Sequence, residues 1–128
     1  MTTEPLFKAA NPYQDDVLAL PVEDLDQASQ WYANALGLTE VERRDDPVPT
    51  VIMQRDGIQI GFAINGGDAS NDGAAILVTD IERARRELEA SGLSPGESRI
   101  DDHGGQKMSV FFLIAPDGLC FYFHQPID

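Results

Sequence analysis

Cysteine, basic side chains and long apolar runs are all scarce in this sequence, and each scarcity excludes a class of protein. One cysteine among 128 residues rules out an internal disulfide and a thiolate cluster. Nine lysines and arginines stand against 22 aspartates and glutamates, which gives a formal net charge of −13. Phosphate binding needs clustered basic residues, so this balance argues against nucleic acid and anionic membranes as partners. It permits a cationic ligand, but it favours an ordinary solvated, self-repelling surface.

No apolar run approaches the length of a membrane span, and the N-terminus shows no apolar signal core. We therefore expect a cytoplasmic protein. The chain length predicts one domain with a sizeable core.

One short pattern occurs twice. Asp56–Phe62 reads D-G-I-Q-I-G-F, and Asp117–Phe123 reads D-G-L-C-F-Y-F. In each copy a D-G turn, which supplies positive φ at little steric cost, opens a strand in which apolar residues alternate with a variable set. We expect the apolar set to face the core and the variable set to face the opposite side.

The order of elements around this pattern is also duplicated. Asp24 begins a helix, with Gln27 completing a capping box, and Gly37 ends it; Asp80 and Gly92 do the same in the second half. The expected elements are, in order, an irregular arm at residues 1–16, a strand at 17–22, the first helix, strands at 38–43, 50–54 and 58–64, a polar linker at 65–72, a strand at 74–78, the second helix, a weak strand at 94–100, a loop at 101–105, and strands at 108–114 and 119–124.

Two such units, each with a helix on one face of an antiparallel sheet, predict an α+β domain built from modules 17–64 and 73–125. The sheet faces away from the helices would then curve around a shared cleft. Strand alternation, together with one of two adjacent phenylalanines, assigns the following residues to that cleft as candidate ligand-binding residues: Val17, Ala19, Gln59, Gly61, Leu77, Phe112, Cys120, Tyr122 and His124.

Three segments carry a family resemblance. They are V-L-A-L-P-V-E-D-L-D-Q-A-S-Q-W-Y at Val17–Tyr32, I-L-V-T-D-I-E-R-A at Ile76–Ala84 and A-P-D-G-L-C-F-Y-F at Ala115–Phe123. Together they resemble the vicinal oxygen chelate superfamily, which includes glyoxalase I, extradiol dioxygenases, fosfomycin-resistance enzymes and bleomycin-resistance binding proteins. The resemblance implies two βαβββ modules that form a cup-shaped mixed sheet, and it implies a homodimer.

Metal enzymes of that superfamily draw His, Gln or Glu ligands from the strands that begin and end each module. The matching positions here are Val17, Gly61, Gly73 and Tyr122. Valine and glycine side chains offer no donor to a divalent metal, and a neutral tyrosine is a poor one. The resemblance therefore implies a member without metal or other cofactor, closer to the bleomycin-resistance proteins, which bind a cationic drug.

Several polar residues could still carry chemistry. Tyr122 and His124 share a strand face, so they could contact a ligand, perform acid–base catalysis or form a hydrogen-bonded wall. Cys120 shares that face without a basic neighbour in sequence, which favours an inert thiol. His103 follows two aspartates on a Gly-rich loop, which is more typical of a mobile surface than of a metal site. Trp31 and Tyr32 favour core packing for at least one of the two rings.

Three hypotheses follow. The first is a metal-independent protein that sequesters or senses a small molecule in the cleft. The second is a lyase, isomerase or dioxygenase that uses a relocated metal or the acid–base chemistry of Tyr122 and His124. The third is a non-catalytic module whose dimer interface is its purpose.

Overall fold

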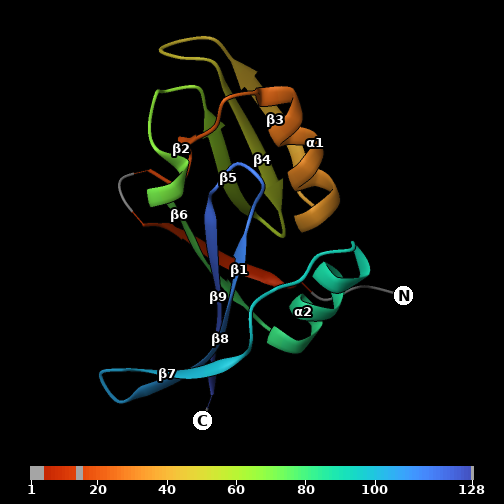
Figure 1. Ribbon diagram of the computed structural model, residues 1–128, viewed down its shortest axis with the longest axis vertical. Helices are drawn as coiled ribbons and strands as arrows, with labels where there is room; N and C mark the ends of the chain where they lie inside the picture. The colour runs from red at the N-terminus through yellow and green to blue at the C-terminus, as the bar shows by residue number, and fades with distance from the viewer. Residues whose placement is uncertain (1–4, 14–15, 128) are drawn as a thin grey trace.

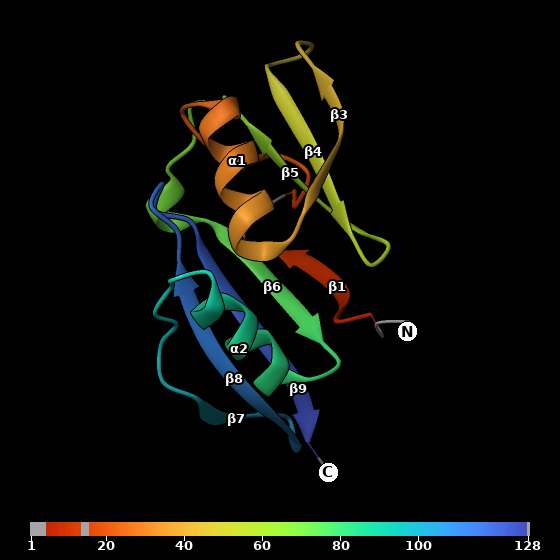
Figure 2. The same cartoon turned by 90° about the vertical axis from the view of Figure 1, so that its right-hand side faces the viewer.

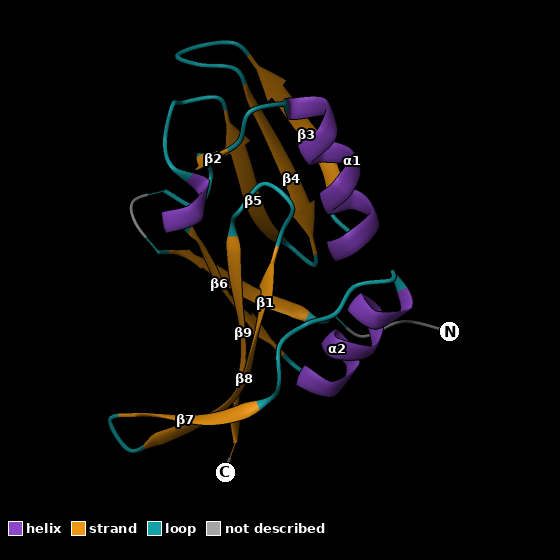
Figure 3. Ribbon diagram, viewed as in Figure 1, coloured by secondary structure: helices purple, strands orange, loops and turns teal. Residues whose placement is uncertain are grey.

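The computed structural model describes residues 5–13 and 16–127, which fold into two sheets and two α-helices (Figure 1). One sheet has the strand order β1-β6-β9-β8-β7, and the other has the order β2-β5-β4-β3. The elements are β1 (Phe7–Pro12), β2 (Leu20–Pro21), α1 (Leu25–Leu36), β3 (Thr39–Arg44), β4 (Thr50–Arg55), β5 (Ile58–Ala63), the short 3₁₀ helix η1 (Ala69–Asn71), β6 (Gly73–Val78), α2 (Ile81–Ala90), β7 (Arg99–His103), β8 (Gln106–Ile114) and β9 (Cys120–Ile127). Figure 3 shows the same arrangement with helices and strands coloured apart.

The two halves of the chain repeat one topology, as predicted. In each half the first strand runs parallel to the last: Leu20 of β2 pairs with Phe62 of β5, and Ile76 of β6 pairs with Phe123 of β9. The remaining neighbours within each half pair antiparallel. The predicted α+β fold of two βαβββ modules is therefore confirmed.

Both helices begin where the sequence predicts, and α1 also ends there, whereas α2 ends at Ala90 with Ser91 as its C-cap, before the predicted Gly92. The Asp24 carboxylate accepts the N–H of Gln27 at 3.0 Å, and Gly37 closes α1 with φ of 68°. The Asp80 carboxylate caps α2 by accepting the N–H of Arg83 at 3.1 Å. Each helix covers one face of its own module's sheet (Figure 2).

Aromatic rings join the two modules beneath the helices. Tyr32 of α1 is fully buried and stacks on Phe62 of its own module with 4.1 Å between ring centroids. The same ring meets the edge of Phe121, in the other module, at 5.5 Å. The apolar sets of the two D-G strands therefore build one shared core, since Ile60, Phe62, Leu119, Phe121 and Phe123 are all buried.

The predicted irregular arm is wrong for residues 7–12, which form the edge strand β1. This strand pairs antiparallel with β6, from Phe7 opposite Val78 to Pro12 opposite Ala74. The physical reason is a long-range contact: Leu6 and Phe7 are buried, and both of their N–H groups donate to the Asp56 carboxylate at 2.9 Å. Residues 1–4 and 14–15 of the predicted arm lie outside the described residues.

One predicted strand and one predicted loop also need correction. The strand expected at 17–22 is only Leu20–Pro21, because Asp16 accepts hydrogen bonds from the N–H groups of Leu18 and Ala19 and holds a turn there. It does lie at a sheet edge, where a proline is tolerated. The expected loop at 101–105 is instead the end of β7 and a tight turn. Gly104 and Gly105 take positive φ there, which lets 99–103 pair with β8.

None of the helices in the described part of the chain is long and apolar enough to cross a membrane.

Candidate functional site

The face of β9 that points away from the helices carries three of the nine candidate ligand-binding residues. Phe121 and Phe123 are 0% and 1% exposed in the core, whereas Cys120, Tyr122 and His124 are half-buried on the opposite face. The predicted alternation of this strand is therefore confirmed. The role of its three outer residues in binding stays a prediction.

A ladder of rings crosses this face. The Tyr122 ring lies 5.0 Å from the ring of Phe112 on β8 and stacks at 5.4 Å on the imidazole of His124. The Arg99 guanidinium, on β7, lies over the Phe112 ring, 5.0 Å from its centroid. We call these four residues together with Asp101 the open-face cluster.

Hydrogen bonds fix the polar edge of the open-face cluster. The Tyr122 hydroxyl donates to Oδ2 of Asp101 at 2.8 Å, and Arg99 Nε donates to Oδ1 of the same carboxylate at 2.9 Å. Burial and, next, the bond to Asp101 raise the pKa of Tyr122 to about 12. The bond to Asp101 likewise raises the pKa of Arg99. At neutral pH this edge therefore presents a protonated phenol, a carboxylate and a guanidinium.

Sequence reasoning missed Arg99 and Asp101 as site residues. Opposite charges two positions apart on one strand would point to the same face. That signal was hidden because Pro95 and Gly96 obscured the start of the strand and Asp101 was assigned to a loop.

The other candidate residues have varied surroundings. Val17 and Ala19 are half-buried in the turn before β2, and Leu77 is half-buried beside His124 in the sheet. Gln59 is exposed on β5, in the other sheet, where its amide donates to Gln54 at 3.2 Å. The structure thus brings Phe112, Tyr122 and His124 into ring contact.

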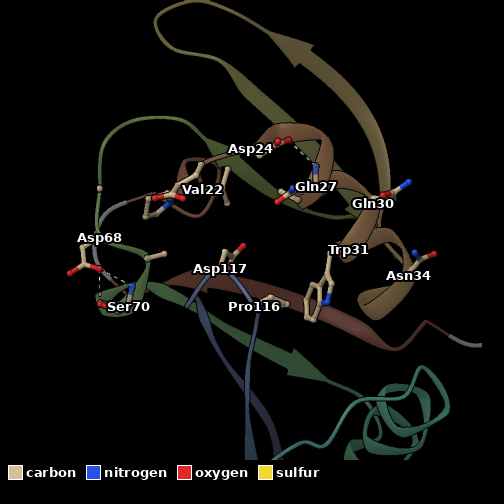
Figure 4. Close-up of a pocket in the computed structure, with 15 residues that line it drawn as sticks. Val22, Asp24, Gln27, Gln30, Trp31, Asn34, Asp68, Ser70, Pro116 and Asp117 are labelled. Carbon is tan, nitrogen blue, oxygen red and sulfur yellow. Dashed lines mark hydrogen bonds between the residues drawn. The ribbon is translucent and has the colours of Figure 1, made fainter.

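A separate pocket of about 720 Å³ lies along α1 (Figure 4). Its walls come from α1 and the residues before it, from the linker between the modules and from the turn that precedes β9. The lining residues are Pro21, Val22, Glu23, Asp24, Gln27, Ala28, Gln30, Trp31, Asn34, Gly67, Asp68, Ala69, Ser70, Pro116 and Asp117. We call it the α1 pocket.

None of the nine candidate ligand-binding residues lines the α1 pocket. Of the two adjacent helix rings, Tyr32 is core, as expected for at least one of them, while Trp31 is half-buried and lines the pocket. No spacing pattern in the sequence distinguishes this pocket, because its walls come from three segments that only the fold brings together.

Comparison with known proteins decides the family. The family model described as "Glyoxalase/Bleomycin resistance protein/Dioxygenase superfamily" matches residues 15–121. The chain belongs to this superfamily. The resemblance inferred from the three sequence segments is therefore confirmed. No curated protein matches the chain.

Solved structures of the superfamily share the fold. A glyoxalase/bleomycin resistance protein/dioxygenase from Alicyclobacillus acidocaldarius is 21% identical and superposes with a TM-score of 0.70, covering 89% of this chain and 93% of that one. A superfamily member from Sphaerobacter thermophilus is 22% identical with a TM-score of 0.59, covering 87% and 97%. TnmS3, described as an antibiotic binding protein from Streptomyces sp. CB03234, is 16% identical with a TM-score of 0.64, covering 90% and 98%.

At two of the four positions that the resemblance assigns to metal ligands, the backbone leaves no room for a side chain. A Cβ atom on Gly61 would lie 2.2 Å from the carbonyl oxygen of Leu18, and one on Gly73 would lie 1.8 Å from that of Cys120. The backbone thus excludes any ligand side chain at both glycines, while Tyr122 keeps its proton on the bond to Asp101. Among the described residues, no group of three or more His, Cys, Asp or Glu side chains could hold a metal ion.

Proposed function

We propose that this chain is a small-molecule binding protein that works without a metal and holds its ligand on the open-face cluster. The observation that carries the proposal is the ladder of Phe112, Tyr122 and His124, with centroid spacings of 5.0 and 5.4 Å. Aromatic faces on a rigid sheet offer a large apolar contact at low entropic cost. Asp101 and Arg99 at the edge of the ladder offer an acceptor and a donor that would orient a polar group of the ligand.

The donor chemistry supports independence from metals. Two of the four superfamily ligand positions are glycines whose Cα atoms lie against backbone carbonyls, and a third is Val17. These are not positions that a small rearrangement of side chains would convert into ligands. A neighbour of the same fold that is described as an antibiotic binding protein is consistent with a sequestering role.

The enzymatic alternative is weaker because of the state of Tyr122. A general base must be deprotonated near the working pH, and the raised pKa of about 12 keeps this phenol protonated. Its proton is also engaged by Asp101 at 2.8 Å. We therefore put binding ahead of lyase, isomerase or dioxygenase chemistry based on this residue.

A homodimer completes the proposal. Phe112, Tyr122 and Leu77 are only half-buried in one copy of the chain, so a second copy across this face would enclose a ligand and cover the apolar surface.

Native mass spectrometry of freshly purified protein, followed by binding assays, tests the proposal. The assay is a thermal-shift and calorimetric screen of aromatic antibiotics against protein dialysed with a chelator. We expect binding to survive the dialysis, and we expect Tyr122→Ala to weaken it about tenfold. Val41→Ala, which trims an exposed apolar residue on β3, is the control and should bind like wild type.

Two results would overturn the proposal. Stoichiometric Fe, Zn, Mn or Ni that survives dialysis would contradict the metal-free site. Equal affinities for wild type, Phe112→Ala and Tyr122→Ala would remove the open-face cluster as the binding surface.

A further inference from the structure

The α1 pocket combines an aromatic wall, amide side chains and charged side chains that are all negative. Trp31 lies on one side, while Pro21, Val22 and Pro116 supply further apolar surface. Figure 4 shows the Trp31 ring directed from α1 toward the turn that holds Pro116 and Asp117. The remaining helix wall is polar, with the amides of Gln27, Gln30 and Asn34. At about 720 Å³ the pocket falls in the usual range for small-molecule sites, roughly 300–1,000 Å³.

Carboxylates supply all of the formal charge around this pocket. Glu23, Asp24, Asp68 and Asp117 line it, and among the residues that the structure describes no lysine or arginine does. In a cleft with low-dielectric walls, charges of one sign focus the potential and concentrate ions of the opposite sign. The net charge of −13 acts in the same direction.

Three of these carboxylates are held by the fold. Asp24 caps α1, and Asp68 accepts hydrogen bonds from the N–H and the hydroxyl of Ser70 at 2.9 and 2.6 Å. Asp117 accepts from the Tyr32 hydroxyl at 3.0 Å and from the N–H of Leu119 at 3.0 Å. The pKa of Asp68 is lowered, and the main cause is the pair of hydrogen bonds that Ser70 donates to its carboxylate. The walls are thus set by hydrogen bonds that belong to the folded chain.

From this combination we infer that the α1 pocket is a second ligand site, and that it takes a small organic cation: an ammonium or guanidinium group joined to a flat apolar body. The flat body packs between Trp31 and the Pro116 side, where the indole face also attracts the cationic group. The carboxylates neutralise the positive charge of the ligand, and the helix amides accept hydrogen bonds from its polar substituents or donate hydrogen bonds to them. This site shares no lining residue with the open-face cluster, so this inference can be tested separately from the proposed function.

Trp31 makes the test direct, because it is the only tryptophan of the chain. The probe is benzyltrimethylammonium, and benzenesulfonate is the anion of similar size. We expect saturable quenching of tryptophan fluorescence by the cation, weaker binding at higher salt, and no saturable quenching by the anion. Equal responses to cation and anion, or no saturation by the cation, would overturn the inference.

Charge-matched variants locate the binding. Glu23 is the carboxylate to change, since Asp24, Asp68 and Asp117 also hold the backbone. Glu23→Gln should weaken binding of the cation about threefold, whereas Glu97→Gln, which alters the net charge equally outside the pocket, should not. If both variants weaken binding to the same degree, the attraction is a property of net charge and the site is wrong.

Two further variants separate this site from the open face. Trp31→Leu, followed by calorimetry, keeps an apolar side chain and should weaken binding about fivefold through loss of the indole face. Tyr122→Ala should bind the cation like wild type. Undiminished affinity in Trp31→Leu, or a loss in Tyr122→Ala, would contradict the assignment to the α1 pocket.

Discussion

All three tyrosines of this chain hold their protons more tightly than a free tyrosine does. Burial and the neighbouring Cys120 raise the pKa of Tyr13, and burial and the bond to Asp117 raise that of Tyr32. Burial and the bond to Asp101 raise the pKa of Tyr122 to about 12. Each phenol therefore has its own surroundings in the folded chain, and those surroundings disfavour the deprotonated form.

Tyrosine titration should therefore be abnormal in the native protein. A group whose pKa is raised on folding stabilises the native state below its unfolded pKa, here 10.0, and that contribution disappears as pH rises through about 12 for Tyr122. We expect little tyrosinate absorbance at pH 10, and a fall in the urea midpoint between pH 10 and 12. Tyr122→Phe, which cannot ionise, should lose less stability over that interval than wild type. A native tyrosine that titrates at pH 10 would contradict this.

Gly61 has a role that only the neighbouring backbone reveals. A methyl group there would lie 2.2 Å from the Leu18 carbonyl oxygen and 2.8 Å from the Ile52 side chain. Gly61→Ala should therefore cost about 3 kcal/mol of unfolding free energy, or unfold the protein. Gly96→Ala, where the nearest atom is 3.3 Å away, is the matched control and should cost far less in a urea titration. Similar stabilities for the two variants would show that the turn at Leu18 can move away from β5.

At the scale of elements, the two D-G turns do more than reverse the chain. Asp56, in the first module, accepts the N–H groups of Leu6 and Phe7, which begin the strand joined to the second module's sheet. Asp117, in the second module, accepts the Tyr32 hydroxyl from the first module's helix. Each turn thus supplies a carboxylate to an element outside its own hairpin, where an ionised acceptor makes a stronger hydrogen bond than a neutral one.

Removing the Asp56 acceptor should release the start of β1. Burial alone would raise the pKa of Asp56, but the N–H groups of Phe7 and Leu6 and the nearby Arg55 lower it, so the group is an ionised acceptor. Asp56→Gly suits the φ of 53° and removes both bonds, so we expect a loss of about 2 kcal/mol and faster hydrogen exchange at Leu6 and Phe7. Asp56→Asn keeps a neutral acceptor and should lose less. Unchanged protection of those two amides in Asp56→Gly would refute the role.

Regular elements could be predicted from the sequence because their signals are local. Caps at Asp24 and Asp80 and the alternation of the D-G strands correctly predicted both helices and the core face of β9. β1 was missed because what holds it, the Asp56 carboxylate, is about fifty positions away in sequence. The α1 pocket was missed for the same reason: its walls at Trp31, Asp68 and Pro116 come from segments without a shared periodicity.

At the scale of the whole molecule, Arg55 ties the two modules together. From the end of β4 its guanidinium donates to the Leu36 carbonyl oxygen at 2.8 Å and to Glu87 of α2 at 2.9 Å. It also lies over the Phe7 ring, 4.6 Å from the centroid. One side chain therefore joins the first helix, the second helix and β1. Its side chain is only 16% exposed, so these contacts are poorly screened by solvent.

The whole-molecule consequence is a prediction about cooperativity. Arg55→Met keeps the apolar stem but leaves Glu87 and the Leu36 carbonyl without this donor, so we expect a loss of about 2 kcal/mol and a broader urea transition as the modules uncouple. Arg44→Met is the matched control, because it makes the same change in net charge at a residue 47% exposed, whose pair with Glu42 spans 3.4 Å. Both variants make the net charge of −13 more negative by the same amount, so both lose the same stability through self-repulsion. Added salt should reduce this common loss and leave the loss specific to Arg55. If the two variants lose equal stability, then Arg55 acts through net charge alone, and the modules must be held together by the apolar core around Tyr32.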